Sequence, residues 1–412
     1  MTIDGPTEET QPAPATAGSP RIALGFACVG HTYAHLFQPI FFIVVLALEK
    51  ELALSHGHAV ALIFVGSVLY GVAAPIAGWL GDRWSATGMI LIYFLGTGVA
   101  MALTGLTETP FQIGAALTLV GLFAAIYHPV GIAWVVRTSV NTGTALGING
   151  IFGGLGPAIA ALMTGALIDS VGWRAAFVLP GAVIAATGVV FGLALLKGWV
   201  VESKTDIKPP PAPASRADTM RVYLVLAFTM SCSGIIYSAV QPALPKAFAL
   251  DFSDSGGIMG VSALVALVYT VSGLMQLFGG WLADVFAARR VYLFTYVLQL
   301  PILFLAGMVS GSPLVVVAMV MLSLNASSLP AENVLIARYT PPHRRALIYG
   351  LKFVVAIGVA NLGILLEGGI YDATGGFFWL YVILTAVGTA AVAAILALPP
   401  ERIPSPEPVP AE

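Results

Sequence analysis

The pentapeptide Gly-Trp-Leu-Gly-Asp at residues 78–82 recurs 202 residues later as Gly-Trp-Leu-Ala-Asp at residues 280–284. Further matches lie on both sides of it at nearly the same offset: Gln38-Pro39 with Gln241-Pro242, and Pro129 and Arg137 with Pro330 and Arg338. Three matches in register indicate that the chain consists of two related halves.

The composition indicates an integral membrane protein. Of the 412 residues, 58% are apolar and only 9% are charged, whereas about a quarter of an average soluble domain is charged. This excludes a disordered chain, a disulfide scaffold and an ordinary cytosolic enzyme. The net charge of −2 gives no basic excess for nucleic acid. Cys28 and Cys232 lie in apolar runs, where we expect buried free thiols.

Long apolar runs predict an all-α membrane protein. A helix needs about 20 apolar residues to cross about 30 Å of hydrocarbon. A membrane β-barrel would instead show short alternating segments. Twelve windows qualify: 22–48, 58–80, 88–106, 110–136, 143–168, 173–196, 221–248, 257–283, 290–309, 313–339, 346–370 and 376–398.

The one long polar stretch lies between the sixth and seventh windows. It contains Pro-Pro-Pro-Ala-Pro at residues 209–213, a sequence typical of a semi-rigid extended linker. The expected organisation is a disordered cytoplasmic tail (1–20), an N-terminal six-helix bundle (21–196), a cytoplasmic Pro-rich linker (197–220), a C-terminal six-helix bundle (221–399) and a cytoplasmic tail (400–412).

The basic residues predict the orientation. If the N-terminus is cytoplasmic, 14 of the 18 Lys and Arg residues fall on the cytoplasmic side, and Lys50, Arg174 and Lys246 fall in outer loops. This asymmetry agrees with the positive-inside rule. We therefore expect a multi-pass protein of the plasma membrane with both termini in the cytoplasm. Residues 1–20 are acidic and rich in Pro and Thr, so we do not expect a signal peptide.

The repeated pentapeptide resembles the signature loop of the major facilitator superfamily, as does the layout of six spans, a polar linker and six spans. The resemblance implies two pseudo-symmetric bundles of six helices. It also implies a conformational latch in which the loop Asp caps a helix end across the interface between the bundles. The first copy departs from the pattern at residues 85–87, Ser-Ala-Thr. The latch residues would be Asp82, Arg83, Asp284, Arg289 and Arg290.

A closer resemblance is to the fosmidomycin-resistance branch of exporters. Gly30-His31 in the first span and Phe123 through His128-Pro129 in the fourth are similar to elements of that branch. The chain departs from it at Ala34-His35 and Val130, where that branch tends to have acidic residues. In the fifth span, Gly156-Pro157 is similar to an exporter motif, and small residues there also allow close helix packing.

The polar residues within the spans are the candidate site residues, because burying them in lipid is costly. His31, His35 and Gln38 form one stripe at helical spacing, and Asn325, Ser328 and Glu332 form another. In the superfamily, the first, fourth, seventh and tenth spans line a central cavity. The substrate-binding candidates are His31, Gln38, Tyr127, His128, Tyr237, Gln241, Asn325 and Lys352.

Glu332 is the one carboxylate that we place deep in a span, and Lys352 lies about one turn inside the eleventh. Burial favours the neutral form of a carboxyl group, so Glu332 is a proton-coupling candidate. A permanent ion pair with Lys352 or Arg338 is the alternative. Lys352 could attract an anionic substrate, pair with Glu332, or extend to the membrane interface.

His31 and His128 are predicted to face each other across the first and fourth spans and to carry protons or bind substrate. Packing in the core is an equally good interpretation, and the case for His35 is weaker. No Cys or further carboxylate accompanies these histidines, so we expect no metal site and no cofactor.

The sequence thus predicts a secondary active transporter and not an enzyme. The leading hypothesis is a proton-coupled exporter of a small organic molecule that could be anionic. The alternative is a proton symporter for uptake of a small organic acid, and a remote one is a transport-inactive sensor or scaffold. The expected partners are the substrate, protons and the lipid bilayer, without nucleic acid, and we expect a monomer.

Overall fold

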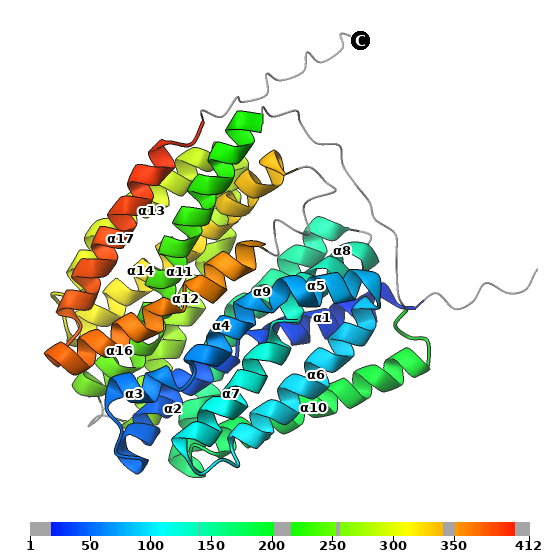
Figure 1. Cartoon of the computed structure of the whole chain (residues 1–412), viewed down its shortest axis with the longest axis horizontal. Coiled ribbons are helices and arrows are strands. Elements are labelled where there is room, and N and C mark those ends of the chain that lie inside the picture. The colour runs from blue at the N-terminus through cyan, green and yellow to red at the C-terminus, as the bar shows by residue number, and fades with distance from the viewer. Residues whose placement is uncertain (1–17, 140, 202–215, 253–255, 341–350, 400–412) are drawn as a thin grey trace, which may run out of the picture.

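The computed structural model describes residues 18–139, 141–201, 216–252, 256–340 and 351–399, and these residues are almost entirely helical. They contain twelve helical segments that are long and apolar enough to cross a membrane. Figure 1 shows the six segments of each half gathered into a bundle of their own. The prediction of an all-α membrane protein with twelve spans is confirmed.

The first half has several spans that are built from more than one helix. The first span is α1 and α2, the second is α3, α4 and α5, and the fourth is α7, η1 and α8. The bounds are α1 Pro20–Ala34, α2 Phe37–Glu51, α3 His56–Ala61, α4 Phe64–Val72, α5 Ala74–Arg83, α6 Ala86–Thr104, α7 Pro110–Ala124, η1 Tyr127–Gly131, α8 Ile132–Thr138, α9 Thr142–Ser170 and α10 Ala175–Leu196.

The second half has longer helices, with an interruption in its eleventh span at a π-helical turn. The first of them begins five residues before the predicted boundary, so the end of the predicted linker is helical. Residues 341–350 lie outside the described part of the chain, and with them the predicted start of the eleventh span. The bounds are α11 Arg216–Phe252, α12 Gly257–Val285, α13 Ala288–Ala306, α14 Gly311–Tyr339, η4 Val354–Val359, α16 Leu362–Thr374 and α17 Phe378–Leu396.

Proline explains the break in the first span. Pro39 has no backbone N–H to donate, and its ring crowds the carbonyl four residues earlier, which belongs to His35. The chain makes a turn at His35 and Leu36, between α1 and α2. In the fourth span, Pro129 lies inside the π-helical turn η1. Both irregular turns carry a histidine, so the breaks in the helices determine where these imidazole rings lie.

Each half buries its own core. Tyr93, Phe94 and Phe191 are fully buried in the first half, and Tyr292 and Tyr381 in the second. Large apolar side chains also cover the outside of the bundles; Phe111, for example, is 84% exposed. Lipid is as apolar as these side chains, so such a surface suits a protein that lies in a bilayer.

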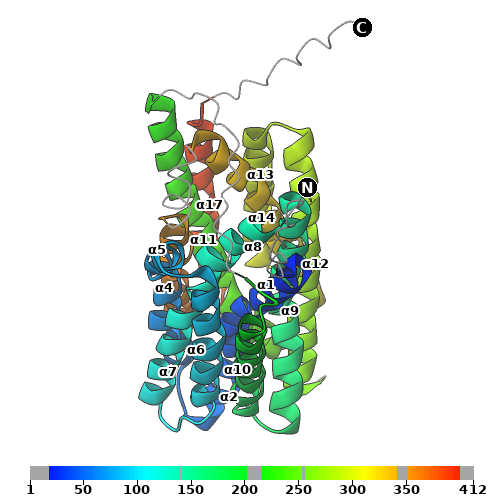
Figure 2. The same cartoon turned by 90° about the vertical axis from the view of Figure 1, so that its right-hand side faces the viewer.

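The two halves meet mainly at one end of the molecule. There α3 packs against α16, α2 against α11, and α4 against η4, while α9 runs along α12. In Figure 1 the ribbons of the two halves meet near α3 and α16 and spread apart toward α8 and α13, and Figure 2 shows the helices of the two bundles from the side. We call these the joined end and the splayed end.

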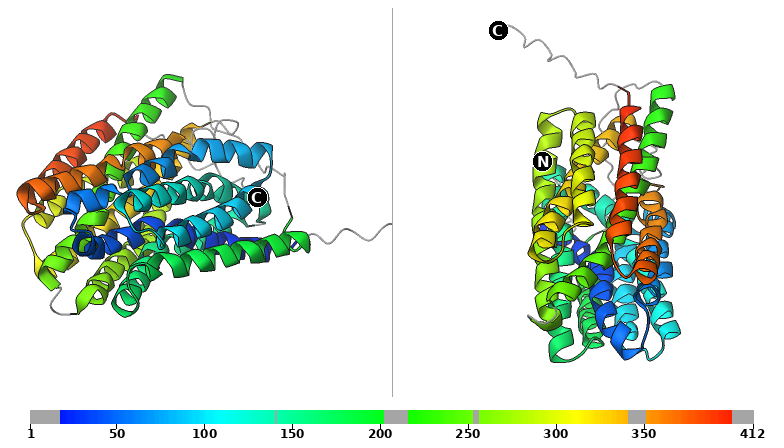
Figure 3. Two further views of the ribbon diagram at one scale, coloured as in Figure 1. Left: turned by 60° about the horizontal axis from the view of Figure 1, so that its bottom comes forward. Right: turned by 90° about the vertical axis from the view of Figure 1, so that its left-hand side faces the viewer.

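One close approach of α9 and α12 is between two glycines, Gly154 and Gly273. A Cβ atom on Gly273 would lie 2.7 Å from the backbone oxygen of Gly154, so residue 273 has no room for a side chain. The further views in Figure 3 show that the two bundles keep the same side-by-side arrangement from other directions. The halves therefore touch here through backbone alone.

Candidate functional site

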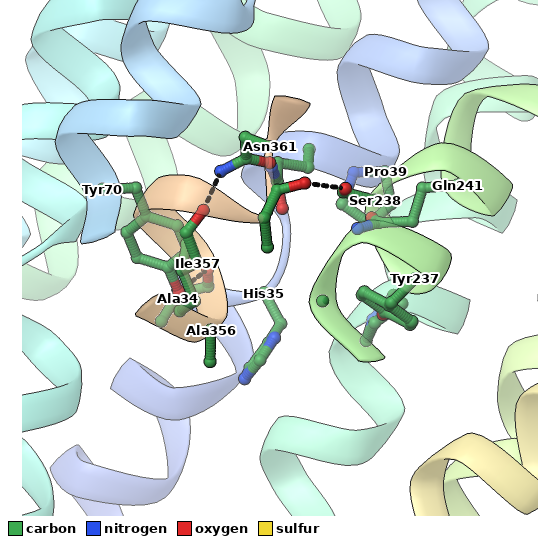
Figure 4. Close-up of a pocket in the computed structure, with 14 residues that line it drawn as sticks. Ala34, His35, Pro39, Tyr70, Tyr237, Ser238, Gln241, Ala356, Ile357 and Asn361 are labelled. Carbon is green, nitrogen blue, oxygen red and sulfur yellow. Dashed lines mark hydrogen bonds between the residues drawn. The ribbon is translucent and has the colours of Figure 1, made fainter. Parts of the chain in front are cut away.

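A cavity of about 90 Å³ lies between the two halves. The broken first span, α4 and α9 form its first-half wall, and α11 and η4 form its second-half wall. Figure 4 shows His35 from the first half and Tyr237 from the second facing the same space. The lining residues are Ala34, His35, Gln38, Pro39, Tyr70, Pro157, Gly234, Tyr237, Ser238, Gln241, Ala356, Ile357, Ala360 and Asn361.

Amide groups bridge the halves at this cavity. The Nε2 group of Gln38 donates to Oδ1 of Asn361 at 3.1 Å and to the hydroxyl of Ser67 at 3.0 Å. The side-chain nitrogen of Asn361 donates in turn to the backbone oxygen of Ser67 at 2.8 Å. Figure 4 shows Asn361 at one edge of the cavity, also bonded to the carbonyl of Ile357. This network joins α2 and α4 to the start of α16.

Three histidines of the first half form a cluster next to the cavity. The ring centroids of His31 and His128 lie 5.4 Å apart, and those of His35 and His128 lie 5.1 Å apart. One nitrogen from each ring can be chosen so that all three lie within 4.8 Å of one another. His31 and His128 thus lie near each other as predicted, and the geometry adds His35. Such spacing could hold a metal ion, whereas the sequence predicted no metal site.

The histidines rest on a layer of aromatic and amide groups. The ring of His31 stacks on Tyr127 at a centroid distance of 5.1 Å. The hydroxyl of Tyr127 donates to the carbonyl of Ala27 and accepts from Asn149 at 2.9 Å. Tyr127 is fully buried and does not line the cavity. In this structure Tyr127 packs against the ring of His31, and a contact of Tyr127 with substrate stays a prediction.

The second half contains a buried ion pair. Lys352 lies 2.8 Å from Oε1 of Glu332, and the side chain of Glu332 is 2% exposed. The hydroxyl of Tyr292 donates to the other carboxylate oxygen at 3.1 Å, and Lys352 also donates to Asn333 at 2.6 Å. Of the alternatives for Lys352, pairing with Glu332 is the arrangement in this structure. Asn325 bonds to the hydroxyl of Ser233 at 3.0 Å inside the same bundle.

Sequence reasoning missed a charged cluster at the joined end, formed by Glu49, His56, Lys246 and Glu367. One ring nitrogen of His56 lies 2.6 Å from Glu49 and the other 2.7 Å from Glu367. Lys246 pairs with the second oxygen of Glu49. We call this the joined-end cluster. Because Lys246 and Glu367 belong to the second half, two of these three pairs, His56 with Glu367 and Lys246 with Glu49, connect the two halves.

Two sequence-based statements are wrong here. The side chain of Glu367 is 0% exposed within α16, so Glu332 is not the only deeply placed carboxylate. Lys246 lies inside α11 and not in an outer loop. Both residues lie inside predicted windows, near the ends where charged groups usually reach solvent, and hydropathy does not show that packing between the halves buries them. The regular recurrence of Glu49, His56 and Lys246 at predicted span ends was the available signal.

The predicted latch residues lie at the splayed end. Asp82 forms an ion pair with Arg137 of the same half. Arg83 lies over the ring of Trp79 at 6.0 Å. Arg289 donates to the carbonyl of Leu396 at 3.1 Å, at the end of α17. Asp284 and Arg290 are exposed. A latch across the interface therefore stays a prediction.

Comparison with known proteins decides the family. The sequence matches the Major Facilitator Superfamily over residues 26–268 and again over residues 224–412. The chain belongs to this superfamily. It is therefore a membrane transporter, and its two halves are the two bundles of a major facilitator. The superfamily is not an enzyme class, which agrees with the sequence analysis.

Relatives of this major facilitator include a protein named for multidrug resistance and one named as a transporter. It is 25% identical to the "Multidrug resistance protein MdtG" of Proteus mirabilis over 346 residues, which cover 82% of this chain and 84% of the relative. It is 26% identical over 168 residues to the "Probable sulfoacetate transporter SauU" of Cupriavidus necator, covering 39% of this chain and 38% of the relative.

A solved major facilitator shares the fold. It is a bacterial homologue of the human lysosomal transporter Spinster, described as inward-facing and unoccupied. The TM-score is 0.70 at 14% sequence identity, and the match covers 92% of this chain and 94% of that one. At this identity the likeness concerns the fold alone.

Proposed function

We propose that this transporter is a proton-coupled exporter of small organic molecules, which bind in the cavity between the halves. The main support from relatives is MdtG, a multidrug resistance protein that matches over 84% of its length. The cavity lies at the interface of the two repeats, where major facilitators are expected to bind substrate. His35, Gln38, Tyr237 and Gln241 supply its polar contacts.

The observation that carries the proton coupling is the buried pair of Glu332 and Lys352. A buried charge needs its partner, because desolvation costs several kcal/mol per ion. When Glu332 takes a proton, Lys352 keeps an uncompensated charge, and this biases the bundle toward another arrangement. In an exporter, Glu332 would gain its proton on the outer side and release it on the inner side. Each cycle would then exchange protons for one substrate molecule.

The orientation belongs to the same proposal. With both termini in the cytoplasm of a plasma-membrane protein, the splayed end faces the cytoplasm and the joined end faces outward. The structure would then represent an inward-facing state of a monomer. Closing the splayed end would bring Asp82 and Arg83 toward Asp284, Arg289 and Arg290, the groups of the predicted latch. Placement in the fosmidomycin-resistance branch also remains a proposal, supported by Gly30-His31 and His128-Pro129.

The contacts of Lys352 with Glu332 and Asn333 favour an alternative function, proton-driven uptake of a small organic acid. An anionic substrate that binds Lys352 displaces Glu332, which then has no counter-charge and takes up a proton. Proton and anion would move together, which is symport. The relative named as a sulfoacetate transporter supports an anionic substrate. Asn333, which bonds to Lys352 at 2.6 Å, would provide a second contact for the anion.

Transport by purified protein in sealed vesicles tests these proposals. A substrate from a panel of drugs, phosphonates and carboxylates is expected to drive proton movement opposite to its own in export, and in the same direction in symport. Glu332→Gln should remove the dependence on the pH gradient, while the exposed Glu108→Gln should keep it. A pH gradient that drives Glu332→Gln as well as wild type would overturn the coupling role. Absence of flux with every substrate would favour a sensor or scaffold.

A further inference from the structure

The three clustered histidines bring one ring nitrogen each close together. The Nε2 atoms of His35 and His128 lie 3.3 Å apart. His31 completes the group, with nitrogen atoms from all three rings within 4.8 Å of one another. A tetrahedral zinc site with Zn–N distances of about 2.0–2.1 Å has its ligand nitrogens about 3.3 Å apart. The spacing of His35 and His128 already equals the edge of such a site.

Neighbouring groups determine which nitrogens can bind an ion. The Nδ1 atom of His31 lies 2.8 Å from the backbone oxygen of Asn149. A carbonyl oxygen only accepts, so Nδ1 of His31 bears the proton and Nε2 has a free lone pair. Metal-bound histidines are typically held in this way by a hydrogen bond from the other ring nitrogen.

The same reasoning applies to His128. The hydroxyl of Tyr70 donates its single proton to the carbonyl of Ala34 at 3.0 Å. Its oxygen can therefore only accept from Nδ1 of His128, which lies 3.1 Å away. In the neutral ring this leaves a lone pair on Nε2 of His128, which accepts the 3.3 Å hydrogen bond from Nε2 of His35. Two of the three rings are thus fixed as neutral tautomers with their lone pairs on the cluster side.

Glycines make room for the rings. A Cβ atom on Gly153 of α9 would lie 2.5 Å from Cε1 and 2.6 Å from Nε2 of His31, and one on Gly156 would lie 2.8 Å from Cβ of His35. The π-helical turn η1 contributes His128, and π-helical turns occur often at functional sites. His35 also lines the cavity, so the cluster has one side open toward it.

We propose that His31, His35 and His128 bind a late first-row transition-metal ion of the Zn²⁺ class, with a fourth coordination position open toward the cavity between the halves. Three imidazoles with one open position are an established zinc-binding set. Among the described residues no carboxylate joins the cluster, so water, hydroxide or a donor atom of a transported molecule would fill the fourth position. This site goes beyond the proposed export function, which does not require a metal.

Metal binding is best measured on the purified full-length protein, isolated with an affinity tag that contains no histidine. Titration of Zn²⁺ against a competing fluorescent chelator is expected to give one ion per chain. Co²⁺ serves as a spectroscopic probe and should give the absorption of a tetrahedral site, because coordination geometry is diagnostic for this ion. A wild-type protein that binds neither ion with this stoichiometry overturns the proposal.

Variants show whether these histidines are the ligands. His35→Ala removes the ligand that faces the cavity and should weaken Zn²⁺ binding by more than the about 10–100-fold typical for loss of an outer-shell partner. His58→Ala is the matched control, since His58 is exposed at the joined end, and it should bind as wild type. Equal affinities of these two variants would refute the assignment.

Gly153→Ala keeps all three ligands but places a methyl group against the ring of His31. Comparing its unfolding temperature with its Zn²⁺ affinity separates a folding defect from a binding defect. It should weaken Zn²⁺ binding about 10–100-fold, as outer-shell changes do. Thermal unfolding without metal monitors folding of each variant. Unchanged Zn²⁺ affinity in Gly153→Ala, in a protein that unfolds at the wild-type temperature, would contradict the proposed use of His31.

Discussion

In the first half, the fourth span carries His128 at its π-helical turn, and the position 201 residues later in the tenth span is Leu329. In the second half, the tenth span carries Glu332, and the position 201 residues earlier is Gly131. A Cβ atom on Gly131 would lie 2.7 Å from the ring of Tyr127, so the first half has no room for a carboxylate there. The repeat keeps the helices, while each half has its own polar chemistry: imidazoles in one, an ion pair in the other.

The largest effect should come from separating the ion pair of the second half. Lys352→Met leaves Glu332 buried without its counter-charge, and breaking a buried pair in this way costs about 3–5 kcal/mol. The double variant Glu332→Gln with Lys352→Met should recover most of this stability but not proton-coupled transport. Thermal unfolding in detergent and vesicle transport measure the two quantities. Equal stability of the single and double variants would show that the pair is not an energetic unit.

A smaller effect is expected at the matching position of the first half. Gly131→Ala forces a methyl group against the ring of Tyr127, and overpacking of this kind costs about 1–3 kcal/mol. The control is Gly147→Ala, because an added Cβ at Gly147 meets nothing within 4 Å. Differential scanning fluorimetry compares the two unfolding temperatures. Identical unfolding temperatures would mean that Tyr127 moves aside. Lack of space at residue 131 would then not explain why the first half has no carboxylate there.

A third comparison uses the repeat-related glutamines Gln38 and Gln241. Both line the cavity, and Gln38 in addition bonds across the interface to Asn361. Gln38→Leu leaves buried polar groups unpaired, which costs about 1–3 kcal/mol in the joined state, and should increase the population in which the joined end is open. Spin labels at residues 84 and 286 of the splayed end would report a shorter distance. The same change in Gln241→Leu would contradict the distinction.

The smallest effect is expected at the ion pair of Asp82 with Arg137. Both groups are partly exposed, and pairs of this kind contribute about 0.2–1 kcal/mol. Asp82→Asn should therefore hardly change the unfolding temperature. If Asp82 also serves as a latch residue, the transport rate falls far more than stability does. Asp284→Asn is the matched variant in the second half, and a latch built from both loops requires that it behave in the same way.

The sequence predicted the twelve spans because hydropathy depends on local composition alone, and the repeat gave the division into halves. It also placed His31 and His128 together, since both lie on spans that meet in the superfamily. The joined-end cluster could not be predicted in this way. His56 and Glu367 are 311 residues apart in the chain and come together only through packing of α3 against α16. The contribution of His35 depends on the break before Pro39, and helical periodicity does not describe that turn.

The contact between Gly154 and Gly273 is a point at which α9 of the first half and α12 of the second could pivot against each other. Neither glycine has a side chain whose rotamer must change. At this contact, α9 and α12 can therefore change their crossing angle without repacking side chains. The contact of His56 with Glu367 and the amide bond of Gln38 with Asn361 join the halves through other helices, so they can break while the glycine contact stays in place. A side chain added at residue 273 would collide with the backbone of Gly154 and restrict this change of angle.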